Sequence, residues 1–183
     1  MRKPNEVIIK GKTLEEILEN HKHWLMGDVE GYKKMRANLD GADISNTDLR
    51  FANLKYAHLD GVNFYKSDLR EADLHRANLF HSNLSYADFR EAKLDGANIV
   101  KSSLIFADFS DANLVGACLV DSNLLNADLE CANLGWADLR NCNLTHANFR
   151  CCNLWHGNLV GAKYVPYIPL RCPSDGAFIG WKK

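Results

Sequence analysis

The sequence predicts an all-β solenoid, a coil built from very short strands, and three features of one repeat support this prediction. From Leu39 to Leu159 every fifth residue is Leu, Ile or Phe, which gives 25 consecutive positions. A small residue stands two places before each position, and it is Ala in 16 cases. The residue directly before is Asn in 13 cases and Asp in 8. Self-similarity at a fixed period is typical of repeat architectures.

A period of five fits neither a regular helix nor an ordinary strand. A helix would spread the large apolar residues around its whole circumference, and a single strand would place them alternately on opposite faces. A coil in which each five-residue unit forms one side and then turns a corner avoids both problems. The large and small apolar residues then point into a shared interior. We expect the Asn and Asp side chains to hydrogen-bond corner backbone groups and one another.

The pattern Ala-(Asp/Asn)-Leu-x-x resembles the pentapeptide-repeat family, and the resemblance covers residues 37–162. It implies a right-handed four-sided parallel β-helix with four units per coil and therefore about six coils. Each coil of such a rod contacts only its neighbours, so both ends need a cap.

Residues 1–36 lack the repeat and are expected to hold a short strand and a capping α-helix. The apolar residues 7–9 are predicted to form a strand that pairs with the first coil. Thr13 and Glu16 form a capping box, and apolar residues follow at helical spacing. We therefore expect an amphipathic helix over 13–26 that covers the first coil, with partner recruitment by the same helix as the alternative.

Residues 163–183 break the repeat with three prolines. We expect this segment to fold across the last coil as a C-terminal cap. The alternative, suggested by related proteins, is that it opens a further domain of a longer protein. The cap is favoured because the segment contains large apolar side chains: Tyr164, Tyr167, Ile168, Phe178 and Trp181.

Composition argues against several functional classes. The chain has 22 Lys and Arg against 23 Asp and Glu, so the strongly basic character of a nucleic-acid binder is missing. No apolar run reaches the ~18 residues of a membrane span. Six Cys are too few for a disulfide scaffold, and no apolar signal region is found. These features predict a cytoplasmic protein with reduced thiols, Cys131 and Cys151 among them.

Catalytic, cofactor-binding and metal-binding residues are not expected. The seven histidines fall on different sides of the coil or in the N-terminal segment. No glycine-rich phosphate loop, Cys-x-x-Cys pair or nucleophile elbow occurs. Because a convex rod also lacks the concavity of most active sites, we expect a protein that is not an enzyme.

The outer side chains must then carry the function, and those of the third side of the coil are charged. Asp precedes the central residue in five units of this side and Arg follows it in four, with Glu71 and Glu91 beside the arginines. We expect these charges to compensate one another. An Arg-lined protein contact is the alternative. The arginines are Arg50, Arg70, Arg90 and Arg150.

The first and second sides supply the candidate interaction surface. Apolar residues occupy outward positions that are polar in earlier coils, and together they form a patch of the size at which interaction sites are suspected. Cover by a chain terminus is the alternative. The candidate residues are Tyr65, Phe80, Tyr86, Val100, Ile105, Phe106, Val120 and Leu125, with Trp136 and Trp155 as a smaller second candidate.

These observations favour a rigid scaffold that binds a protein partner or a second copy of the chain, and no direct binding of nucleic acid or membrane. The resemblance supplies an alternative, because some pentapeptide-repeat proteins bind DNA gyrase or topoisomerase IV by imitating DNA and so alter quinolone sensitivity. Mimicry needs a dense, uncompensated negative surface. The repeats carry 16 acidic and 10 basic residues, a net charge of −6, which does not favour it.

Overall fold

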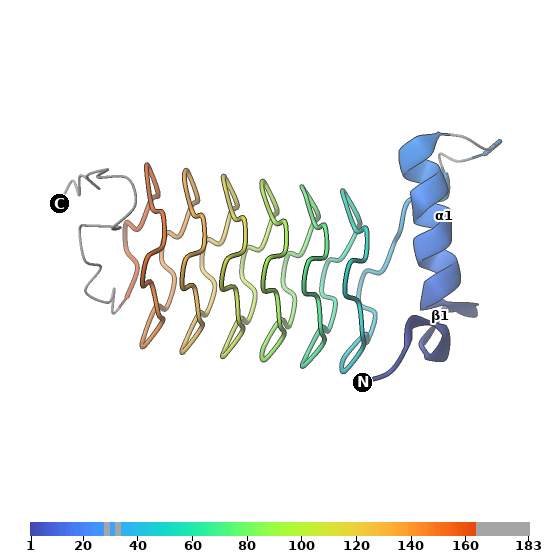
Figure 1. Cartoon of the computed structure of the whole chain (residues 1–183), viewed down its shortest axis with the longest axis horizontal. Helices are drawn as coiled ribbons and strands as arrows, with labels where there is room; N and C mark the ends of the chain where they lie inside the picture. Colours follow the sequence, from blue (N-terminus) through green and yellow to red (C-terminus); the bar gives the residue numbers. More distant parts are fainter. Residues whose placement is uncertain (28–29, 32–33, 164–183) are drawn as a thin grey trace.

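The repeats wind into a rod of stacked coils (Figure 1). The structure is a computed structural model, and it describes residues 1–27, 30–31 and 34–163. Parallel bridges join residues 20 positions apart, from the pair Asn38 and His58 to the pair Asn143 and Lys163. A bridge recurs at every fifth residue. Each five-residue unit is therefore one side of a coil, as the repeat predicts.

Backbone hydrogen bonds tie each side to the coils before and after it. The N–H of Leu49 donates to the carbonyl of Asp68 at 2.7 Å, and the N–H of Asp68 donates back to the carbonyl of Thr47 at 3.0 Å. The same exchange is repeated along the rod. It satisfies backbone groups that would be costly to leave unpaired between the coils.

Two residues after each central position form a corner, and the second of them has a positive φ. The φ angle is 62° at Phe51 and 61° at Trp136, which places L side chains in the left-handed region at a cost of about 1–2 kcal/mol each. A backbone hydrogen bond at the corner offsets part of this cost. At Phe51, for example, the backbone N–H donates to the carbonyl of Arg70 on the next coil at 3.0 Å. The sequence analysis did not anticipate this corner conformation.

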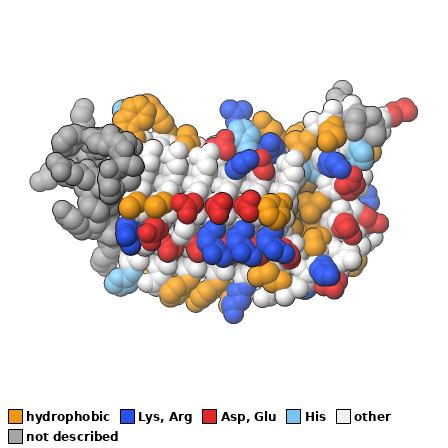
Figure 2. Space-filling view, viewed as in Figure 1, with side chains coloured by type: hydrophobic (Ala, Val, Ile, Leu, Met, Phe, Trp, Pro, Cys, Tyr) orange, Lys and Arg blue, Asp and Glu red, His pale blue; other side chains and the backbone are white. Residues whose placement is uncertain are grey.

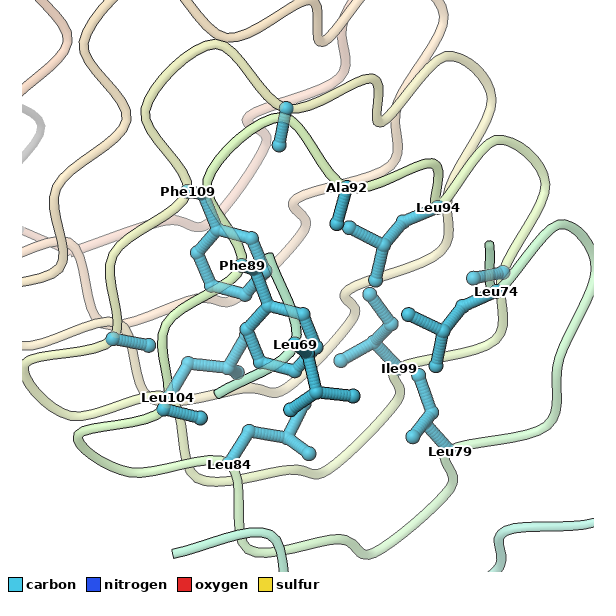
Figure 3. Close-up of a cluster of buried hydrophobic side chains, with 14 of the residues drawn as sticks. Leu69, Leu74, Leu79, Leu84, Phe89, Ala92, Leu94, Ile99, Leu104 and Phe109 are labelled. Carbon is cyan, nitrogen blue, oxygen red and sulfur yellow. The ribbon is translucent and has the colours of Figure 1, made fainter. Parts of the chain in front are cut away.

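The central Leu, Ile and Phe side chains point inward and stack along the rod axis (Figure 3). Every central residue from Leu39 to Leu154 is buried, which confirms the predicted interior. The rings of Phe89 and Phe109 stack with their centroids 4.8 Å apart. Leu159, in the last described coil, is only partly buried.

Small residues fill the rest of the interior, and the polar ones among them are hydrogen-bonded. The Ser82 hydroxyl donates to the Leu59 carbonyl at 2.9 Å, and Ser102 repeats this bond on the next coil. Cys142 occupies the same column, where burial raises the pKa of its thiol to about 12. Cys142 is thus a small core residue, as the repeat predicts.

The Asn and Asp side chains bond both the corners and one another, as expected. The Asp48 carboxylate accepts the N–H of Arg50 at 3.2 Å. The Asn83 amide donates to the Asn63 side-chain oxygen on the preceding coil at 3.0 Å.

The N-terminal segment pairs differently from the prediction. After a short 3-10 helix η1 (Pro4–Glu6), strand β1 (Ile8–Ile9) pairs antiparallel with strand β2 (Lys12–Thr13) instead of with the first coil. Lys10 and Gly11, with φ angles of 50° and 82°, reverse the chain within two residues and so keep the strand in a local hairpin. The first coil is paired by Arg2, which forms a parallel bridge with Thr47.

Helix α1 (Leu14–Met26) follows and lies across the N-terminal end of the rod in Figure 1. The predicted capping box is present, because the Thr13 hydroxyl accepts the Glu16 N–H and the Glu16 carboxylate accepts the Thr13 N–H. Gly27 ends the helix in the left-handed conformation, with φ of 65°. Leu14 is fully buried in the same apolar cluster as the coil interior.

His21 joins α1 to the coils. Its ring is wholly buried, Nδ1 accepts the N–H of Ala37 at 3.1 Å, and Nε2 donates to the carbonyl of Lys55 at 2.9 Å. These two bonds require the neutral imidazole with its proton on Nε2. Burial lowers the pKa of His21, and the nearby charge of Arg36 lowers it further.

The expected C-terminal cap falls outside the described residues, together with its apolar side chains.

Replacing Leu94 by Ala should reduce the free energy of unfolding by about 2–5 kcal/mol, because it leaves a cavity between stacked side chains. Chemical denaturation followed by circular dichroism measures this loss. Lys93→Ala, at the exposed neighbouring position, is the matched control and should change stability far less. Equal stability of the two variants would contradict the inward assignment of Leu94.

Stability should fall as the pH drops below about 6.5, because the unfolded chain then binds a proton that the buried His21 ring resists. The loss should continue until the pH passes the lowered pKa of the folded state. Denaturation at pH 8 and pH 5.5, each compared with His21→Ala, isolates this contribution. The variant should be less stable at pH 8 and less sensitive to acid, and an identical acid response in both proteins would refute the assignment.

Candidate interaction surface

The outward side chains that differ most between coils come from the corners. One side of the coil separates each corner from the next. The residue directly before the central residue of that side forms the bridges to neighbouring coils, and its side chain is mostly polar. The corner after the first side and the corner after the second side therefore flank one polar column. That column contains Asn63, Asn83, Ser103 and Asn123.

Three aromatic rings stack along the corner after the second side. Tyr65 and Tyr86 make an edge contact with ring centroids 5.6 Å apart, and Tyr86 stacks on Phe106 at 5.1 Å. Tyr86 is 47% exposed and Phe106 is 48% exposed. The ammonium group of Lys66 lies 5.2 Å from the ring centre of Tyr65, within reach of a cation–π interaction. We call Tyr65, Tyr86 and Phe106 the aromatic ladder.

The other predicted residues divide between two corners. Ile105 and Leu125 lie on the corner of the aromatic ladder and are partly buried. The preceding corner holds the remaining three, Phe80, Val100 and Val120, which are also partly buried. The polar column lies between these two groups. The eight residues thus form two apolar columns, with the exposed aromatic area on one of them.

The second candidate lies on the corner after the fourth side. The rings of Trp136 and Trp155 contact edge to face at 5.4 Å, and both contact the ring of His156, at 4.1 and 4.2 Å. Trp136 is 57% exposed and Trp155 is 51% exposed.

Phe51 is an exposed aromatic residue that the sequence analysis missed. It is 66% exposed and, with Lys3, Pro4 and Arg50 among others, lines a hollow of about 420 Å³. Its place as the second residue of a corner was the signal that could have identified it.

Arginines and aspartates of the third side form a continuous charge ladder. Arg70 makes two hydrogen bonds to the Asp68 carboxylate, at 2.7 and 2.9 Å, and lies 3.6 Å from Asp88 on the next coil. Arg50 and Arg90 repeat this arrangement. Figure 2 shows the basic side chains as a row along the rod, beside a row of acidic ones. The expected charge compensation is confirmed for these arginines and aspartates.

Arg50 and Arg70 also hold Asp48 and Asp68 in the charged form. Hydrogen bonds from Arg50 lower the pKa of Asp48 to about 2. Burial alone would raise the pKa of Asp68, but the hydrogen bonds and charge of Arg70 outweigh it and the pKa is lowered. The row is therefore a chain of ion pairs in which three arginines lie between four aspartates.

In residues 1–27, 30–31 and 34–163, no three His, Cys, Asp or Glu side chains are grouped to hold a metal ion. A hollow of about 510 Å³ beside the N-terminal hairpin has Lys10, Lys12 and Lys34 among its lining residues, but no histidine or cysteine. Within the same described residues, no helix is long and apolar enough to cross a membrane.

The family model for pentapeptide repeats matches the chain in eight copies, over residues 35–70, 72–105, 87–126, 107–145 and 127–163. The chain belongs to the pentapeptide-repeat family. Proteins of this family fold as right-handed quadrilateral β-helices, which agrees with the parallel bridges at every fifth residue.

Solved structures of other pentapeptide-repeat proteins match parts of this chain. A protein from the thylakoid lumen of Arabidopsis thaliana is 32% identical, with a TM-score of 0.51, over 51% of this chain and 66% of that one. HetL of the cyanobacterium Nostoc, involved in heterocyst differentiation regulation, is 28% identical, with a TM-score of 0.28, over 68% of this chain and 73% of its own. QnrB1, a plasmid-mediated fluoroquinolone resistance protein, is 21% identical, with a TM-score of 0.41, over 68% of this chain and 85% of its own. A comparison with curated proteins finds no match.

Proposed function

We propose that this pentapeptide-repeat protein is a rigid, non-enzymatic scaffold that presents the aromatic ladder to a protein partner. The observation that supports this proposal is the row of contacting rings of Tyr65, Tyr86 and Phe106, of which two rings are about half exposed. Other coils carry polar residues at the same corner position, namely Asn46, Asn126 and His146. The exposed rings of Tyr86 and Phe106 are therefore a local departure at a corner position that is otherwise polar.

The rigidity of the rod makes these rings suitable for binding. Each ladder residue is attached to a corner whose backbone is hydrogen-bonded to the next coil, as at Tyr86, whose N–H donates to the Ile105 carbonyl at 2.9 Å. A surface ordered in this way loses little conformational entropy when a partner binds. Aromatic side chains also provide much contact area for few rotatable bonds.

We infer further that α1 caps the N-terminal end of a rod of about six coils. The support is the buried Leu14 and the two hydrogen bonds of His21 to the coils. The acid sensitivity expected for His21 tests this attachment as well.

The alternative is a DNA-mimicking binder of DNA gyrase or topoisomerase IV, and the net charge of −6 over the repeats is its support. The charge ladder argues against it, because Arg50, Arg70 and Arg90 neutralise the aspartates beside them. We expect no inhibition of gyrase supercoiling at low micromolar concentrations of the protein. Inhibition that is lost on charge reversal of exposed acidic residues would favour the alternative.

Replacing Ile105 and Phe106 together by Ser should weaken association with a protein partner, a second copy included, at least tenfold, because it removes the end of the aromatic ladder. A photo-crosslinking amino acid at position 66, combined with light scattering after size exclusion, measures this association. Phe51→Ser, on a different corner, is the control that should leave it unchanged. Equal crosslinks and equal molar mass for parent and double variant, with unchanged circular dichroism, would exclude the ladder as the binding surface.

A further inference from the structure

Cys131 and Cys151 stack directly above one another at the corner after the third side. Both are second corner residues with φ of 57°, so their side chains leave the rod in the same direction. The N–H of Cys131 donates to the carbonyl of Arg150 at 2.8 Å, which fixes the two corners in register. Cys131 is exposed and Cys151 is half-buried, so both can be reached from solution.

The two thiols also influence each other, since the neighbouring Cys151 contributes to raising the pKa of Cys131. The other cysteines in the described part of the chain occupy different columns. Cys118 stands in a bridged column between Asn98 and Asp138, and Cys142 and Cys152 are buried in the interior. Cys131 and Cys151 are therefore the thiol pair that the coil register of the described residues brings together.

We propose that Cys131 and Cys151 form a modification site for small-molecule disulfides, in which thiol–disulfide exchange links the two coils reversibly. The thiolate of one cysteine attacks a sulfur of the small disulfide, which forms a mixed disulfide and releases one small thiolate. The second cysteine then attacks the protein sulfur of that mixed disulfide and releases the other small thiolate. The protein pair loses two electrons, the small disulfide gains them, and the two thiol protons pass to the departing thiolates.

The spacing of the coils permits this bond and also limits its strength. Equivalent residues on neighbouring coils lie about 4.8 Å apart, within the Cα separation that a disulfide tolerates. Their Cα–Cβ bonds run parallel and do not converge, so the two corners must move slightly closer together to bring the Cβ atoms within disulfide distance. A disulfide formed under such strain is readily reduced.

The surroundings of Cys131 disfavour its thiolate. Partial removal from water, with the neighbouring Cys151, Asp111 and Glu130, raises the pKa of Cys131. Because the thiolate is the attacking species, exchange proceeds through a small ionised fraction at neutral pH. Arg150 lies 3.6 Å from Glu130 and partly balances that charge.

To test this proposal, the 183-residue chain is treated with oxidised glutathione, the remaining thiols are blocked with iodoacetamide, and the tryptic peptides are mapped by mass spectrometry. The expected product joins the peptide containing Cys131 to that containing Cys151, two mass units lighter than the sum of the separate peptides, and reduced glutathione reverses it. Cys131→Ser and Cys151→Ser should each reduce the yield of this linked peptide at least tenfold. Cys118→Ser, which keeps the pair and removes the other cysteine of the same tryptic peptide, should form it as the parent does.

Alkylation of both cysteines after excess oxidised glutathione, in protein whose circular dichroism is that of the untreated chain, would overturn the proposal. So would a crosslink that persists in Cys131→Ser, or mixed disulfides with glutathione that never resolve into the linked peptide.

Discussion

The hydrogen-bonded register between neighbouring coils is the constraint on which the rest of this structure depends. Each residue of the repeats meets the residue 20 places away, at the spacing of paired strands. Side-chain interactions therefore occur as columns. Inside the rod Phe89 stacks on Phe109, and outside it Arg70 lies between Asp68 and Asp88. Packing, charge compensation and the candidate surface are consequences of one backbone geometry.

This constraint explains why so much of the fold could be predicted from the sequence. The place of a residue in its five-residue unit determines whether it faces the interior, a side or a corner. Leu94 is buried, the Ser102 hydroxyl is hydrogen-bonded inside, and Asn83 joins its neighbour on the preceding coil, as their places in the repeat indicate. The pairing of arginines with aspartates on the third side followed from the same periodicity.

The N-terminal features that escaped prediction depend on contacts outside that periodicity. The turn at Lys10 and Gly11 closes a local hairpin. The strand propensity of residues 7–9 does not determine which segment that strand pairs with. The two bonds of His21 depend on where α1 docks. The apolar surface was expected as one patch because outward residues were grouped by side, whereas the corners that carry them are a full side apart. Its role in binding remains a prediction.

Because every five residues form one side of the coil, insertions can change the direction in which the surface faces. Inserting a whole unit would rotate everything beyond it by a quarter turn about the rod axis, while the interior would still receive a large apolar residue at every fifth place. The aromatic rings, the charged row and the tryptophans would then face new directions relative to the N-terminal helix. The direction in which each unit faces therefore depends on the number of units before it and can change without a change in the packing of the core.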